Sequence, residues 1–148
     1  MEDFAGVYID RKKDTEILLE HQRMIAAHLG GIAVESRLKS LLIQYHKINE
    51  WEEKSSRKKC SLFNQKIKNP GHGVMTAIRQ IPDLWHRAKL DKLFLEHLAN
   101  IINPLGATSV DYINVRYIPQ SSADLNNEWK KSFDYVCGWL KQNEDVIS

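Results

Sequence analysis

The sequence contains few of the residues that interrupt regular structure. Of its 148 residues, seven are glycine and four are proline, a share well below the roughly 12% of average proteins. Folds built from many short strands and turns depend on these residues, as do many disordered tails. The sequence therefore disfavours both. Its length predicts one domain over residues 1–148, which buries about 70% of the surface of the unfolded chain.

An excess of charge of either sign is also missing. The 21 lysine and arginine residues are balanced by 19 aspartate and glutamate residues, which gives a formal net charge of +2. A protein that binds nucleic acid mainly through the phosphate backbone shows a clearer basic excess or stripe. The composition remains compatible with a small-molecule, protein or weak RNA partner.

Cysteines and long apolar segments are equally scarce. Cys60 and Cys137 are the only cysteines, too few for a disulfide scaffold, and neither belongs to a Cys-x-x-Cys motif. We expect free thiols and a reducing compartment. The acidic first residues lack the apolar core of a signal peptide, and no apolar run approaches the roughly 20 residues of a membrane span. These absences predict a cytoplasmic protein without membrane contact.

Apolar residues recur at intervals of three and four along most of the chain, which is the spacing of amphipathic helices. This pattern predicts helices over residues 14–30, 32–48, 74–81, 84–102 and 125–142. Asp124 is the candidate N-cap of the last helix. Residues 110–118 alternate and favour β-structure, but a single strand has no partner, so we expect an extended connector. The predicted fold class is all-α: an up-and-down helical bundle of four to five helices with one extended connector.

Gly30 and Gly31 leave the boundary between the first two helices open. They can end one helix and begin another, or lie within a helix where a neighbour approaches closely. Two glycines cost a helix interior about 2 kcal/mol. We therefore expect either a break or a tight crossing at this point.

Two pairs of polar residues on the predicted helices are candidates for chemistry. Arg23 and His28 suit phosphate chemistry, because a guanidinium stabilises anionic charge and an imidazole transfers protons near neutral pH. Their spacing of five does not place them on one face, and such pairs arise often by chance. Glu35 and Lys39 form an i,i+4 pair in the favoured order. The pair is either solvated or, if buried, one in which Lys39 neutralises Glu35.

The connector carries a third candidate, Arg116 beside Tyr117. An arginine next to an aromatic ring can bind a phosphate or a base, or it can fasten the connector to the bundle by hydrogen bonds. We favour the fastening role. No two of the six histidines are three or four residues apart, so we expect no metal site and no cofactor.

Several segments resemble HEPN domains (higher eukaryotes and prokaryotes nucleotide-binding). Residues 27–42, AHLGGIAVESRLKSLL, resemble the signature helix of that family, in which a small residue is followed by Glu and then by Leu-Lys. The residues that fit this pattern are Gly31, Glu35, Leu38 and Lys39. His72 before an apolar turn is similar to the start of the short third helix. Arg116-Tyr117 followed by a proline resembles the stretch before the last helix. The resemblance covers about residues 20–142.

The resemblance implies a helical bundle, usually a homodimer, with one of two roles. Many members are metal-independent ribonucleases of toxin–antitoxin or defence systems, with an Arg-x4–6-His motif paired across the dimer. Others lack that motif and bind nucleotides or RNA, or act as partners of small nucleotidyltransferases. Here Met24 follows Arg23 where the family commonly has a polar residue, and Arg23 precedes the Glu35 helix instead of opening a later one. No histidine follows Arg116 within six residues.

We therefore expect a non-catalytic HEPN-like protein that binds a nucleotide, RNA or a partner protein such as a nucleotidyltransferase or antitoxin. Its groove would be surrounded by the polar residues Glu35, Lys39, Arg116 and Tyr117. The alternative is a metal-independent ribonuclease toxin that uses Arg23 and His28. A second alternative is a structural dimer with Trp129 and Trp139 at the subunit interface.

Overall fold

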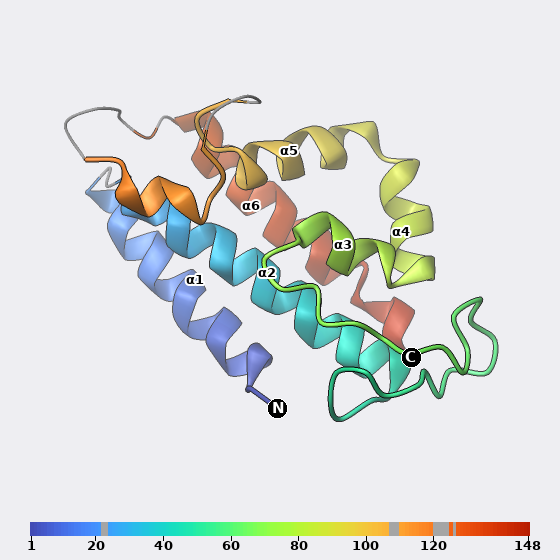
Figure 1. Cartoon of the computed structure of the whole chain (residues 1–148). Helices are drawn as coiled ribbons and strands as arrows, with labels where there is room; N and C mark the ends of the chain where they lie inside the picture. The colour runs from blue at the N-terminus through green and yellow to red at the C-terminus, as the bar shows by residue number, and fades with distance from the viewer. Residues whose placement is uncertain (22–23, 107–109, 120–124, 126) are drawn as a thin grey trace.

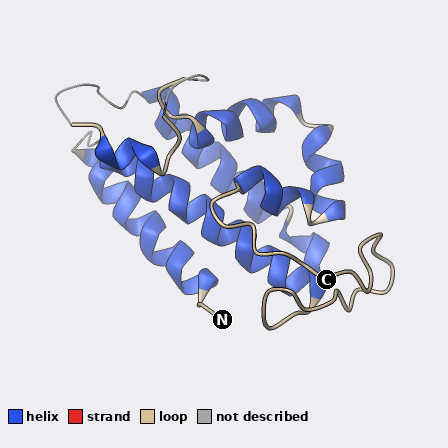
Figure 2. Ribbon diagram, in the orientation of Figure 1, coloured by secondary structure: helices blue, strands red, loops and turns tan. Residues whose placement is uncertain are grey.

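Helices account for the regular structure of the residues that the structure describes. The computed structural model describes residues 1–21, 24–106, 110–119, 125 and 127–148 (Figure 1). Within these ranges there is no β-strand, only two isolated bridges inside the loop after the second helix (Figure 2). The elements are α1 (Phe4–Glu20), α2 (Ile25–His46), α3 (Val74–Arg79), α4 (Pro82–Lys89), α5 (Lys92–Ile102), η1 (Asn114–Tyr117), α6 (Asn127–Gln142) and η3 (Glu144–Ile147). The all-α class is confirmed for this part of the chain. No helix in it has the length and apolar character that crossing a membrane requires.

Helix α2 is the central helix of the fold, and it is buried on almost every side. Val34, Leu38 and Leu41 are fully buried, and each contributes about 1.5–3 kcal/mol by leaving water. Helix α1 runs antiparallel beside α2, while α3, α5, α6 and η1 cover its other faces (Figure 1). A polar residue near the middle of α2 is therefore surrounded by protein and needs partners from other elements.

The boundary between the first two helices differs from the expected one. Helix α1 begins at Phe4, where the Asp3 carboxylate accepts from the Gly6 N–H at 2.9 Å, and it ends at Glu20. The prediction of a helix over residues 14–30 is therefore wrong, because a capping side chain starts the helix earlier. Gly30 and Gly31 lie inside α2.

Of the two alternatives expected at these glycines, a helix break or a tight crossing, the structure shows the tight crossing. A Cβ at Gly30 would overlap the indole of Trp129, and a Cβ at Gly31 would overlap Tyr112. The two aromatic side chains pack directly on the backbone of α2. The space that glycine leaves is therefore filled by distant parts of the chain.

The helix predicted over residues 84–102 is interrupted. It consists of α4 and α5, because the Asp91 carboxylate caps α5 by accepting from the Phe94 N–H at 3.0 Å. The other oxygen of the Asp91 carboxylate accepts from the Trp139 indole N–H at 3.0 Å. The break leaves Leu90 and Leu93 exposed, at 74% and 51%.

The connector before α6 is not extended, contrary to the prediction. Its residues form a turn and then the 3-10 helix η1, because the Asp111 carboxylate accepts from the N–H groups of Ile113 and Asn114. Local capping thus outweighs the β-propensity of the segment. The candidate cap Asp124 lies outside the described residues. Helix α6 ends at Gln142, as predicted.

The two cysteines are buried free thiols, as expected. Burial raises the pKa of Cys137 to about 11. The thiolate is the reactive form of cysteine, so Cys137 is a packing residue at neutral pH.

His46, near the end of α2, is fully buried and uses both ring nitrogens. Nε2 lies 2.6 Å from the carbonyl oxygen of Gln80, and Nδ1 lies 2.6 Å from the Ser55 hydroxyl. A carbonyl only accepts, so Nε2 donates and Nδ1 accepts from Ser55. Burial lowers the pKa of His46 below its ordinary 6.5, and the charge of Arg57 adds to this shift. The folded protein therefore holds His46 neutral.

This burial predicts a loss of stability in mild acid. The stabilisation that comes from burying neutral His46 is fully present above pH 6.5. It is lost as the pH falls below 6.5, because His46 in the unfolded chain then binds a proton that His46 in the folded protein does not bind. The free energy of unfolding then falls by at most about 1.4 kcal/mol per pH unit from this one group. Urea unfolding at pH 7.5 and 5.5 measures it. His46→Gln should reduce the fall in stability, and the exposed-site control His86→Gln should retain it. Equal falls in the wild type and His46→Gln would contradict the assignment.

Candidate functional site

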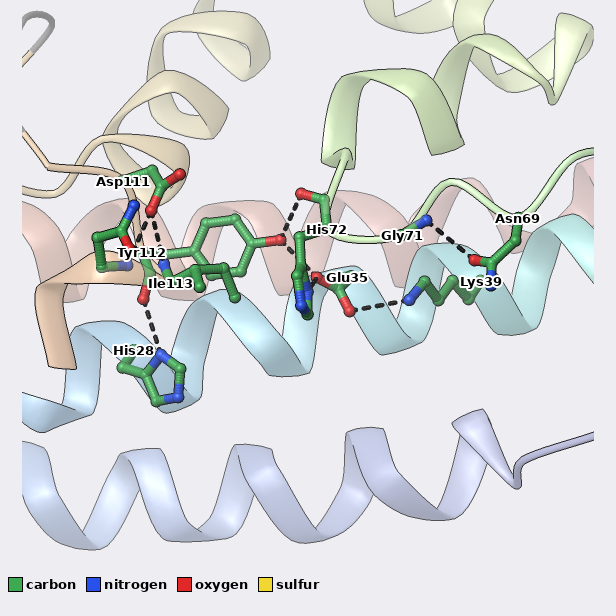
Figure 3. Close-up of polar contacts among 10 residues, drawn as sticks. His28, Glu35, Lys39, Asn69, Gly71, His72, Asp111, Tyr112 and Ile113 are labelled. Atoms are coloured by element: carbon green, nitrogen blue, oxygen red, sulfur yellow. Dashed lines mark hydrogen bonds and ion pairs between the residues drawn. The ribbon is translucent and has the colours of Figure 1, made fainter.

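The buried carboxylate of Glu35 is the centre of a polar cluster that joins three segments of the described structure. Its side chain is 6% exposed. Oε2 accepts from the Lys39 ammonium at 3.0 Å, while Oε1 accepts from the Tyr112 hydroxyl at 2.5 Å and from His72 Nδ1 at 2.8 Å (Figure 3). A buried carboxylate without partners costs several kcal/mol. Donors from three separate segments therefore allow Glu35 to remain inside the protein.

Lys39 lies one turn after Glu35 on α2, with its side chain 9% exposed. Its ammonium stands 5.4 Å from the centroid of the Phe4 ring, an attractive cation–π distance. Lys39 thus neutralises Glu35 from the same helix. The expectation that a buried Glu35 would be paired with Lys39 is confirmed.

Tyr112 connects the cluster to the segment before η1. Its hydroxyl lies 2.8 Å from the carbonyl oxygen of His72 as well as 2.5 Å from Glu35. Burial, followed by the nearby Glu35 carboxylate, raises the pKa of Tyr112 well above its ordinary value. The phenol therefore stays protonated and donates. Gly31, one turn before Glu35, provides the space in which its ring lies.

A tight turn positions His72 just before α3. The Asn69 side-chain oxygen accepts from the Gly71 N–H at 2.9 Å, and Gly71 has φ +58°, which glycine adopts without strain. The turn directs His72 Nδ1 onto Glu35 while 63% of the imidazole side chain remains exposed. A glycine next to the histidine is thus part of the geometry of the site.

The cluster forms one wall of a pocket of about 510 Å³ between the start of α1, the middle of α2 and the 69–72 turn. Lys39 and His72 contribute polar groups to its lining. The half-buried ring of Trp51 contributes an aromatic surface and packs against Phe4 with ring centroids 6.0 Å apart. The pocket can therefore hold a small ligand that has both a planar apolar face and polar atoms at its edge.

Arg116 and Tyr117 lie apart from this pocket, on η1. The Arg116 guanidinium lies 4.8 Å from the ring centroid of Tyr117, a residue that is 70% exposed. Tyr112, and not these two residues, makes the hydrogen bonds that fasten the connector to Glu35 and His72. The four predicted groove residues therefore lie at two separate positions on the molecule: Glu35 with Lys39, and Arg116 with Tyr117.

The pair Arg23 and His28 is described only in part, because Arg23 lies outside the described residues. His28 is half-buried, and its Nδ1 lies 2.8 Å from the carbonyl oxygen of Tyr112. Nδ1 therefore donates to that carbonyl and ties α2 to the connector. This contact gives His28 a structural role.

Sequence reasoning did not group His72 and Tyr112 with Glu35. The signal for His72 was its position between two glycines ahead of a short helix. Tyr112 is 77 residues away from Glu35, and the only hint was that Gly31 required a close neighbour. No group of three or more His, Cys, Asp or Glu side chains suited to a metal occurs among the described residues.

Comparison with protein-family models, with curated proteins and with solved structures finds no match to the chain.

Proposed function

We propose that the protein is a non-catalytic HEPN-like binding protein, and that a nucleotide occupies the pocket beside Glu35. The observation that supports this proposal is the combination of polar atoms fixed by a buried carboxylate with the aromatic surface of Trp51. Nucleotide and other small-ligand sites pair an aromatic or apolar surface with a few placed polar groups. The volume of about 510 Å³ lies within the usual range of roughly 300–1,000 Å³.

The other elements of the proposal follow the same resemblance. The helices would form an up-and-down bundle, and two copies would form a homodimer. A partner protein, such as a nucleotidyltransferase or an antitoxin, would contact the exposed Arg116–Tyr117 surface on η1. The hydrogen bond between His28 and the Tyr112 carbonyl supports binding over the alternative of a ribonuclease that uses Arg23 and His28.

The pocket predicts nucleotide binding that depends on Trp51. Calorimetric titration with the 5′-triphosphates of adenosine, guanosine, cytidine and uridine should give saturable binding for at least one of them. Trp51→Ala should weaken that binding roughly ten- to a hundredfold, because stacking of a base on an aromatic ring contributes about 1–3 kcal/mol.

Trp85→Ala is the matched control, since Trp85 is also half-buried but lies outside the pocket lining. It should leave the affinity unchanged, and thermal unfolding checks that both variants are folded. If none of the four nucleotides binds at about 1 mM, the proposed function is wrong.

A further inference from the structure

The charges around the pocket do not favour a phosphate group. The charged groups of the lining residues are the carboxylates of Glu2 and Glu35, the ammonium of Lys39 and the N-terminal ammonium of Met1, so their charges sum to zero. The Lys39 ammonium already forms an ion pair with Glu35 at 3.0 Å. Sites that hold phosphate usually offer unpaired cations or free backbone N–H groups. The pocket has no excess of positive side-chain charge with which to attract one.

The N-terminus of α1 does not change this balance. Phe4, the first residue of α1, lines the pocket, and a helix N-terminus has a partial positive charge. The Asp3 carboxylate, however, already accepts from the Gly6 N–H at 2.9 Å. This cap supplies the negative charge that a bound phosphate would otherwise bring.

The polar atoms of the cluster instead suit the edge of a heterocycle. The Glu35 carboxylate only accepts hydrogen bonds, so His72 donates to it through Nδ1, and Nε2 is the ring nitrogen that remains to accept a hydrogen bond from a ligand. The Lys39 ammonium is a donor. An acceptor and a donor on one wall complement the adjacent donor and acceptor atoms that each nucleobase presents at its edge. Trp51 offers an aromatic surface on which the plane of the base can stack.

We infer, on the basis of the proposed function, that the pocket recognises the uncharged heterocyclic base of its ligand through Lys39, His72 and Trp51 and leaves the phosphates in solvent. The ligand class is then a nucleobase or nucleoside, and a nucleotide binds through the same part. Affinity depends on the base and is nearly independent of the number of phosphates.

The test is a calorimetric comparison of adenosine, AMP and ATP, repeated with cytidine, CMP and CTP, in 50 mM and 500 mM NaCl. The dissociation constants within each series should agree to about twofold, and salt should change them by less than about twofold. A phosphate held by an available cation would strengthen binding by about tenfold or more, with an advantage that fades in high salt.

His72→Ala gives a second measurement, with His86→Ala as the exposed control on α4. His72→Ala should weaken adenosine and ATP by the same factor, about three- to tenfold for one hydrogen bond. His86→Ala should change neither. A loss confined to ATP would place His72 against phosphate and would overturn the inference.

The outcomes separate the two proposals. Nucleotides that bind at least tenfold more tightly than their nucleosides would overturn this inference and leave the proposed function in place. Absence of binding by nucleosides and nucleotides alike would overturn the proposed function itself.

Discussion

Glu35→Leu should lower the free energy of unfolding by about 3–5 kcal/mol, the usual effect of breaking a buried ion pair by removing one partner. The substitution leaves the Lys39 ammonium, only 9% exposed, without its carboxylate. It also removes the acceptor that holds the Tyr112 hydroxyl and His72 Nδ1. Urea unfolding at pH 7 measures the change.

A double substitution distinguishes the unpaired charge from the lost packing. Glu35→Leu with Lys39→Met should be more stable than Glu35→Leu alone by about 1 kcal/mol or more, because no charge remains buried. The matched control is the ion pair between Lys130 and Asp134, which has the same i,i+4 spacing but side chains 58% and 56% exposed. Asp134→Leu should leave the unfolding midpoint nearly unchanged. A stable Glu35→Leu variant would show that the carboxylate is not needed for folding.

Gly31→Ala should destabilise the protein by about 2–3 kcal/mol, although alanine is the better helix former. Its Cβ would overlap the Cβ and ring of Tyr112. Tyr112 cannot easily move, because its carbonyl accepts from His28 and its hydroxyl donates to Glu35. Overpacking of this kind costs roughly 1–3 kcal/mol, and disturbance of the hydrogen bonds adds to it, so the loss exceeds the gain of about 1 kcal/mol in helix propensity.

Gly138→Ala in α6 is the control, since a Cβ there meets nothing within 4 Å. It should stabilise the protein by about 0.5–1 kcal/mol, the effect of helix propensity alone. Thermal or urea unfolding of the two variants should therefore give opposite signs. The same sign in both would mean that the close approach of Tyr112 to α2 does not limit packing.

These two predictions concern the same feature, a distant aromatic residue held against the middle of α2. The pocket beside Glu35 depends on it, because Tyr112 fixes both the carboxylate and the carbonyl of His72. A loss of stability and a loss of ligand affinity should therefore accompany each other in Gly31→Ala. Trp51→Ala should lower the affinity while the cluster around Glu35 stays intact, because Trp51 makes none of the hydrogen bonds of that cluster.

The sequence determined the elements whose causes are local. Periodic apolar residues specify α3, α6 and the part of α2 after Gly31, and the i,i+4 spacing places Lys39 beside Glu35 whatever surrounds them. The errors were local as well: Asp3 starts the first helix earlier than predicted, Asp91 divides the helix predicted over residues 84–102, and Asp111 starts a 3-10 turn where β-propensity predicted an extended connector. In each case one carboxylate that caps backbone N–H groups outweighs the average preference of its neighbours.

The tertiary structure alone decided what those elements form together. The sequence shows that Glu35 needs a partner if it is buried, and that Gly31 allows a close neighbour. It does not show that Tyr112 is that neighbour, or that His72 supplies the third hydrogen bond, because these contacts join residues far apart in the chain. Pairings of this kind depend on how α2 is covered on all sides. The polar residues of the candidate site were thus present in the sequence, whereas their assembly into one pocket depends on long-range packing.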